Sequence, residues 1–222
     1  MTRHMSVICM GLAMFAVASS ASAEEKLLEL GAKEWKYLDT GDDPGNDWNK
    51  AEFDDSKWKS GQALLGFGDD DIKQTISFGD DDENKRTCTF FRRTVEVKDP
   101  SSAKKFLGKL ICDDGCVVYV NGEEVHRFNL PDGKVKSDTN AKMTSGGELE
   151  RLEMTVLVDP AKFKPGKNII AIRVHQATPN SSDLAFDMSL EALPDDEAVE
   201  TAQRQFDEEK RAIQEFEEQQ AF

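Results

Sequence analysis

Hydrophobic and polar residues alternate along short segments between residues 26 and 193. In segment 184–193, LAFDMSLEAL, the large apolar residues Leu184, Phe186, Met188 and Leu190 occupy every second position. Successive side chains of a strand point to opposite faces, so this period of two predicts β-strands. Gly, Pro, Asn and Asp separate the segments at short intervals, as in all-β domains. Four further strands are predicted on the same grounds, over residues 87–97, 104–111, 152–158 and 168–176.

Residues 116–128, CVVYVNGEEVHRF, predict a β-hairpin. The Asn121-Gly122 pair lies between two alternating segments, and a type I′ turn needs positive φ at both of its central residues, which Asn and Gly tolerate best. We expect Val118 and Val120 on one face of the hairpin and Tyr119 on the other.

The chain changes character after Pro194. Residues 194–222 are rich in helix formers, with acidic residues in the first turn, where the helix dipole favours negative charge. Apolar residues recur at heptad-like spacing, which predicts one acidic amphipathic helix. Three roles stay open for residues 195–222: packing on the β-domain, a frayed charged tail, or docking on a protein partner or a second copy. The apolar positions are Val199, Ala202, Phe206, Ile213 and Phe216.

The N-terminus has the pattern of a secretory signal peptide. Arg3 precedes the apolar run 7–18, and the small residues of segment 21–23 form a cleavage pattern. The apolar run is shorter than the roughly 20 residues of a spanning helix. We expect a signal peptide over 1–23, a β-domain over 24–193, a helix over 194–222, no membrane span after cleavage, and export to the periplasm or the outside of the cell.

The chain is strongly acidic, with 43 Asp and Glu against 28 Lys and Arg and a net charge of −15. This balance argues against nucleic acid as a partner, because phosphates are neutralised by Lys and Arg. Acidic loops at 39–47, 68–71 and 79–83 could supply oxygen ligands, but none has the spacing of an EF-hand loop. We therefore expect no cofactor and no dedicated metal site. Structural calcium held by dispersed loops stays open.

Three cysteines follow the signal peptide: Cys88, Cys112 and Cys116. An exported protein lies in a disulfide-permissive compartment, so one bridge and one free thiol are expected. Cys88 bonded to Cys112 or to Cys116 is the favoured pairing, with a Cys112–Cys116 bridge as the alternative. The C-x₃-C spacing differs from redox C-x-x-C motifs, and too few histidines accompany it to indicate zinc.

Four segments in order resemble a known family: 51–58 (AEFDDSKW), 90–97 (FFRRTVEV), 113–125 (DDGCVVYVNGEEV) and 164–176 (KPGKNIIAIRVHQ). They are similar to galactose-binding-like jelly rolls, to the sugar-binding-type N-terminal domain of glycoside hydrolase family 2, and to modules of secreted bacterial multidomain proteins. The resemblance covers roughly residues 34 to 192. It implies an antiparallel jelly-roll β-sandwich that binds or scaffolds and does not catalyse.

The same resemblance directs attention to loops at one end of the sandwich. Asp113 and Asp114, together with His175, Gln176 and Asp183, are the candidate ligand-binding residues. In the alternative role, His175 pins its own loop through hydrogen bonds to Ser181, Ser182 or Asp183. No catalytic residue is assigned, since no nucleophile motif such as Gly-x-Ser-x-Gly is present.

The tryptophans are interpreted as structural, and Trp48 is expected to be more exposed than Trp35 or Trp58 because it follows DDPGND. The predicted function is a non-catalytic module that binds a glycan, cell-surface polysaccharide or other glycoconjugate. The alternative is a structural or protein-interaction subunit that docks through residues 195–222. A hydrolase is a remote third hypothesis.

Overall fold

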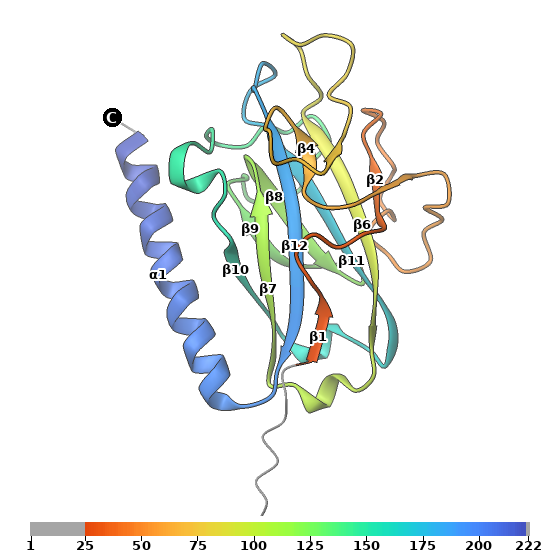
Figure 1. The fold of residues 1–222 in the computed structure, drawn as a ribbon, viewed down its shortest axis with the longest axis vertical. Coiled ribbons are helices and arrows are strands. Elements are labelled where there is room, and N and C mark those ends of the chain that lie inside the picture. The colour runs from red at the N-terminus through yellow and green to blue at the C-terminus, as the bar shows by residue number, and fades with distance from the viewer. Residues whose placement is uncertain (1–24, 221–222) are drawn as a thin grey trace, which may run out of the picture.

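The computed structural model describes residues 25–220, which form two stacked β-sheets flanked by one helix (Figure 1). The first sheet has the strand order β10-β7-β12-β4-β5, with β1 paired to β12, and the second has the order β3-β2-β6-β11-β8-β9. All pairings are antiparallel except β4 with β5. The predicted fold class, an antiparallel β-sandwich followed by a helix, is confirmed. The predicted signal peptide lies outside the described residues.

The first sheet is built from β1 (Glu25–Leu28), β4 (Leu65–Phe67), β5 (Gln74–Thr75), β7 (Lys105–Cys112), β10 (Met154–Val158) and β12 (Leu184–Leu193). The second is built from β2 (Trp35–Leu38), β3 (Lys59–Gly61), β6 (Cys88–Val97), β8 (Gly115–Val120), β9 (Glu123–Phe128) and β11 (Gly166–His175). Short 3₁₀ turns span Pro100–Ser102, Gly147–Leu149 and Pro160–Lys162, and α1 spans Asp196–Gln220.

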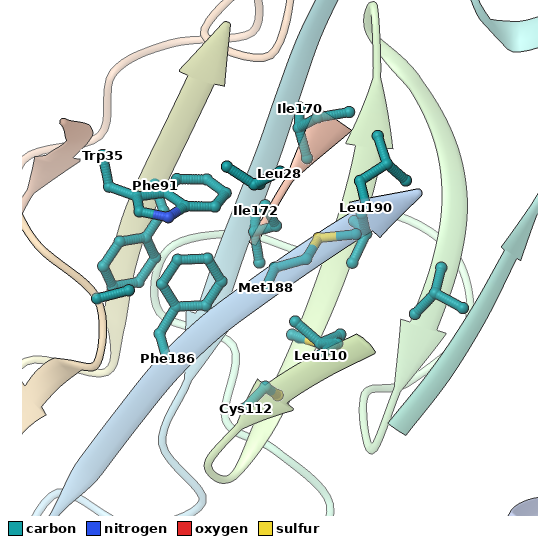
Figure 2. Packing of buried hydrophobic residues seen from close by; sticks show 14 of the residues in the cluster. Leu28, Trp35, Phe91, Leu110, Cys112, Ile170, Ile172, Phe186, Met188 and Leu190 are labelled. Atoms are coloured by element: carbon teal, nitrogen blue, oxygen red, sulfur yellow. The ribbon is translucent and has the colours of Figure 1, made fainter. Parts of the chain in front are cut away.

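The core lies between the two sheets, where the alternating apolar side chains meet (Figure 2). The Phe186 ring of the first sheet stacks on Phe91 of the second, with ring centroids 4.1 Å apart. Trp35 meets the same ring edge-on at 4.9 Å. Each ring is fully buried, so the apolar area that this cluster removes from water is a large favourable term in folding.

The predicted hairpin is present as β8 and β9. Asn121 and Gly122 have φ of 51° and 91°, the left-handed conformations that the turn requires. Val118 and Val120 belong to the main core, while Tyr119 packs with residues on the other side of the sheet. The alternation of the sequence therefore assigned the two faces correctly.

Helix α1 lies along β10, an edge strand of the first sheet (Figure 1). Ala202 is buried and Ile213 packs against the core. The Glu209 carboxylate accepts hydrogen bonds from the backbone N–H and the hydroxyl of Thr155, at 2.6 and 2.8 Å. The helix thus packs on the β-domain, the first of the three roles expected for it. Within residues 25–220, no helix has the length and apolarity of a membrane span.

Candidate functional site

The predicted ligand-binding residues Asp113 and Asp114 form the turn between β7 and β8 and are buried. The Asp114 carboxylate accepts from the backbone N–H groups of Ser145 and Ala177, at 2.6 and 2.8 Å. The backbone carbonyl of Asp114 accepts from Asn129 Nδ2 at 3.2 Å and from the Ser145 hydroxyl at 3.0 Å. This turn therefore fastens the long connections that follow β9 and β11.

Asp113 and Gln176 lie next to each other at this turn, and each is 1% exposed. Gln176 Nε2 donates to the Asp113 carbonyl at 3.4 Å, while Asp113 Oδ2 and Gln176 Oε1 are buried acceptors without a donor among the described residues. Burial, reinforced by the charges of Asp114 and Asp183, raises the pKa of the Asp113 carboxyl to about 9. Asp113 is therefore protonated at neutral pH, which limits the cost of burying it.

His175 is fully buried on the outer face of β11. Its Nδ1 donates to the Thr139 carbonyl at 2.6 Å, and its Nε2 accepts from Arg173 Nε at 2.8 Å and lies 3.4 Å from Cys88 Sγ. The predicted hydrogen bonds to Ser181, Ser182 or Asp183 are wrong. Residues i and i+2 of a strand share a face, so His175 falls beside Arg173 and its register partner Cys88.

Asp183 is the one candidate ligand residue that is half-exposed, and its carboxylate accepts from the Ser182 hydroxyl at 2.9 Å. The structure thus brings Asp113, Asp114 and Gln176 together, whereas His175 faces the other side of the second sheet. At most 1% of the surface of each of these four side chains is accessible. Ligand contact through these four buried residues stays a prediction, and it would require the surrounding structure to open.

The favoured disulfide between Cys88 and Cys112 or Cys116 is not found, because all three cysteines are free and buried. Strand β11 lies between β6, which carries Cys88, and β8, which carries Cys116. Moreover, Cys88 packs on the outer face of the second sheet, while Cys112 and Cys116 face the core. A disulfide needs two Cα atoms within about 7 Å of each other and side chains that point toward each other. Cys88 cannot meet this condition with Cys112 or Cys116, because its side chain lies on the opposite face of the sheet.

Two of the acidic loops, 39–47 and 68–71, carry carboxylates that pair with cations of the protein itself. Asp39, 1% exposed, accepts from Lys59 Nζ at 2.9 Å and from the Ser77 backbone N–H at 2.8 Å. Arg151 pairs with Asp69 and with Asp71. Within residues 25–220, no cluster of three or more Asp, Glu, His or Cys side chains is arranged to hold a metal ion.

The outer face of the second sheet carries a pocket that the sequence did not reveal. It lies over β6, β8, β9 and β11, between the loops 43–49 and 133–138, and encloses about 530 Å³. We call it the Trp48 pocket. Its lining combines the aromatic residues Trp48, Phe90 and Tyr119 with the charged residues Glu124, Arg127 and Arg173.

Arg92 on β6 holds the first wall of the Trp48 pocket. Its Nε donates to Asp55 Oδ2 at 2.8 Å, and its Nη1 donates to the carbonyls of Trp48 and Lys50. The turn that follows DDPGND is thereby fixed with the indole of Trp48 edge-on to Phe90, at 4.9 Å between centroids. Trp48 is only 4% exposed, less than Trp58 at 8%, so the expectation that it would be the most exposed tryptophan is wrong.

Two further arginines hold the second wall. Arg173 Nη1 donates to the Val135 carbonyl at 2.8 Å. Arg127 donates to Gly133 O at 3.1 Å and forms a two-point ion pair with Glu124, both contacts at 2.8 Å. Ser137 Oγ donates to Asp43 Oδ2 at 3.1 Å and connects the two walls. Long polar side chains thus support both loops around a floor of aromatic rings.

The sequence contains one indication of this pocket, in the outward positions of its strands. Residues of the same parity on β6 and β11, Phe90, Ala171 and Arg173, face away from the core, and so does Tyr119 on β8. Aromatic and apolar residues at outward positions indicate a covered surface, but which loop covers them depends on tertiary contacts. The wall residues Trp48 and Lys134 lie far from each other in the sequence.

A scan of this sequence against protein-family models finds no match, and a search of curated proteins finds none either. Solved structures do share the fold. A β-glucuronidase 2 from Bacteroides uniformis, covalently bound to cyclophellitol-6-carboxylate aziridine, matches with TM-score 0.51 and 17% identity. A second Bacteroides uniformis β-glucuronidase structure matches with TM-score 0.51 and 16% identity.

Both matches cover 78% of this chain and 18% of the larger one. The chain therefore spans less than a fifth of the length of the protein chains in these two structures, and at this identity the likeness concerns the fold. A match of this extent corresponds to one domain of a larger β-glucuronidase chain, and it agrees in fold with the resemblance indicated by the four sequence segments.

Proposed function

We propose that this protein is a non-catalytic module that binds a carbohydrate or glycoconjugate, and that the Trp48 pocket is its ligand site. The observation that carries the proposal is the lining of this pocket. Aromatic side chains offer apolar surface to a sugar ring, and the surrounding amide, hydroxyl and charged groups match its hydroxyls. A volume of about 530 Å³ lies in the usual range of ligand pockets.

The histidine beside the pocket is not available as a general base. His175, the histidine nearest to its floor, is fully buried, and both of its ring nitrogens are engaged. Burial and the Arg173 charge lower the pKa of His175 to about 3, so it is neutral and its Nε2 is occupied by the Arg173 donor. These features support binding rather than hydrolysis.

The alternative function, a structural or protein-interaction subunit that docks through residues 195–222, is less well supported. On α1, Ala202 is buried, Ile213 packs against the core of the β-domain, and Glu209 is bonded to β10. Removal of residues 195–222 tests this alternative, because an oligomer or complex that depends on the helix would be lost. We also propose that the protein is exported through its N-terminal signal peptide. N-terminal sequencing of the secreted protein tests this.

The direct test of the proposal is binding to a panel of soluble neutral and acidic polysaccharides, measured by affinity electrophoresis and titration calorimetry. Tyr119→Ala and Asn46→Ala change two pocket residues, and each is expected to weaken binding about tenfold. Phe206→Ala on α1 is the control, since it removes an aromatic side chain outside the pocket. Absence of binding to every polysaccharide, or equal effects of the three substitutions, would contradict the proposal.

A further inference from the structure

Arg173 is a buried positive charge in the Trp48 pocket. It is 7% exposed, and its guanidinium lies 5.2 Å from the centroid of the Phe90 ring. Its three recorded acceptors are His175 Nε2 at 2.8 Å, Val135 O at 2.8 Å and Cys88 Sγ at 3.9 Å. An arginine side chain has five N–H donors. The Tyr119 hydroxyl, which also lines the pocket, interacts with this guanidinium as well.

None of these acceptors neutralises the charge. His175 is neutral for the reason given above, and burial keeps Cys88 in the thiol form by raising its pKa to about 12. Within residues 25–220, no carboxylate forms an ion pair with Arg173 at 4.0 Å or less. Arg92, the other buried arginine, has Asp55 at 2.8 Å.

The acidic residues that line the pocket are engaged elsewhere or exposed. Asp43, whose charge acts on the Cys88 thiol, accepts from the Gly45 backbone N–H at 2.8 Å and from the Ser137 hydroxyl at 3.1 Å. Glu124 is paired with Arg127. Asp138 is exposed, on the loop that also carries the pocket residues Lys134 and Lys136.

A buried charge without a counter-ion is costly, and arginine cannot reduce that cost by losing its proton. An anion that enters the pocket would supply the missing partner. The planar guanidinium fork binds carboxylates through two parallel hydrogen bonds, and the Phe90 ring beside it restricts its orientation. The Tyr119 ring, which is partly exposed and packs edge-on against the buried Trp48, offers the ligand body an aromatic surface.

Building on the proposed function, we propose that the Trp48 pocket selects glycans that carry a carboxylate, such as uronic acid residues, and that Arg173 binds that carboxylate. The overall charge of −15 repels polyanions at long range, so this recognition depends on a local contact and not on electrostatic attraction by the whole protein. Selectivity for the carboxylated sugar is the distinguishing consequence.

The test compares uronate polymers of several linkages, beginning with polygalacturonate, with the same polymers after reduction of each carboxyl to a primary alcohol. Each pair differs only in the group at the carboxyl position. We expect the full-length processed protein to bind at least one carboxylated polymer about tenfold or more tightly than its reduced form. Equal binding, or preference for the reduced forms, would overturn the carboxylate assignment and leave the proposed function standing. Failure to bind either form or any other glycan would overturn the proposed function itself.

Arginine variants then locate the contact. Arg173→Met should abolish the preference for the carboxylated polymer, and Arg173→Lys should retain part of it, because charge remains while the planar fork is lost. Arg151→Met is the control, since Arg151 pairs with Asp69 and Asp71 outside the pocket. A preference that survives Arg173→Met but disappears in Lys134→Gln/Lys136→Gln would overturn the role of Arg173. Should Arg173→Met fail to fold, the comparison of matched polymers with the unmodified protein still decides whether a carboxylate is recognised.

Discussion

His175 Nδ1 donates a hydrogen bond to the Thr139 carbonyl, 2.6 Å away, and so joins the end of β11 to the loop that follows β9. Because a carbonyl can only accept, the proton resides on Nδ1, and Nε2 is free to accept from Arg173. This one ring therefore orients the guanidinium in the Trp48 pocket and anchors the loop that forms one of its walls.

Substitution of His175 by Gln tests this link. We expect a loss of about 1–3 kcal/mol in the free energy of unfolding at pH 7, because buried partners lose their bonds. The folded-state pKa of about 3 lies below the ordinary value of 6.5. The unfolded chain thus takes up a proton that the folded chain excludes, and the advantage of the unmodified protein shrinks as pH falls from 6.5 toward 3.

Urea unfolding of both proteins between pH 7 and pH 4 measures this difference. Gln cannot titrate, so the gap should narrow by up to about 1.4 kcal/mol per pH unit in this window. A gap that stays constant with pH would contradict a neutral, buried His175.

Asp113→Asn is expected to stabilise the protein at and above neutral pH. The pKa of Asp113 is raised from 3.8 to about 9, mainly by burial. The contribution of its carboxyl group to the free energy of unfolding is therefore fully present below pH 3.8 and is lost as the pH rises toward 9. An amide stays neutral at all of these pH values and therefore avoids this loss. The gain at pH 8 should exceed about 1.4 kcal/mol, the equivalent of one pKa unit, and should vanish near pH 4.

Thermal and urea unfolding at pH 4, 6 and 8 provide the measurement. Asp138→Asn, at an exposed position, is the matched control and should change little at any pH. Destabilisation by Asp113→Asn at pH 8 would show that the carboxylate is ionised and needed.

Asp55→Ala should destabilise the protein by about 2–4 kcal/mol, because it leaves the buried guanidinium of Arg92 without its carboxylate. Asp54→Ala is the control, since this exposed side chain bonds locally to Ser56, with the Ser56 backbone N–H at 3.0 Å, and its loss should change the free energy of unfolding far less than the loss of Asp55. Chemical unfolding gives both values. Equal effects of the two substitutions would contradict a special role for the Arg92 pair.

Glu209→Ala should loosen α1. The substitution removes the acceptor of the Thr155 backbone N–H at the edge of the first sheet, at a cost of about 1–3 kcal/mol. Amide hydrogen exchange should accelerate along α1 and β10, with the rest of the sandwich unchanged. Glu208→Ala, one residue away and exposed, should leave exchange as it is. Unchanged protection of α1 in Glu209→Ala would show that the apolar contacts suffice.

The three cysteines of the described region should behave as free, protected thiols. Burial raises the pKa of each of Cys88 and Cys112, and the thiolate is the reactive form. Alkylation followed by mass spectrometry should label none of the three in the folded protein within minutes and all three in denaturant without reductant. A mass lower by two hydrogens, with two unlabelled cysteines, would reveal a disulfide.

The sequence alone determined the class of fold and the inner face of the strands. Alternation in 184–193 assigned Phe186, Met188 and Leu190 to the core, and Asn121-Gly122 assigned the hairpin, because strand period and turn conformation are local properties of the chain. The helix after Pro194 was predictable for the same reason.

Only the tertiary structure decided which outward residues form a site. The Trp48 pocket depends on Arg92 and Arg173 reaching loops that are more than 30 residues away in sequence, and no local pattern encodes those contacts. The order of strands likewise placed β11 between Cys88 and Cys116 and put His175 beside Arg173 instead of Ser181. Pairing across a sheet depends on strand order and register, which join residues that lie far apart along the chain. The contacts of these residues therefore could not be predicted from the sequence alone.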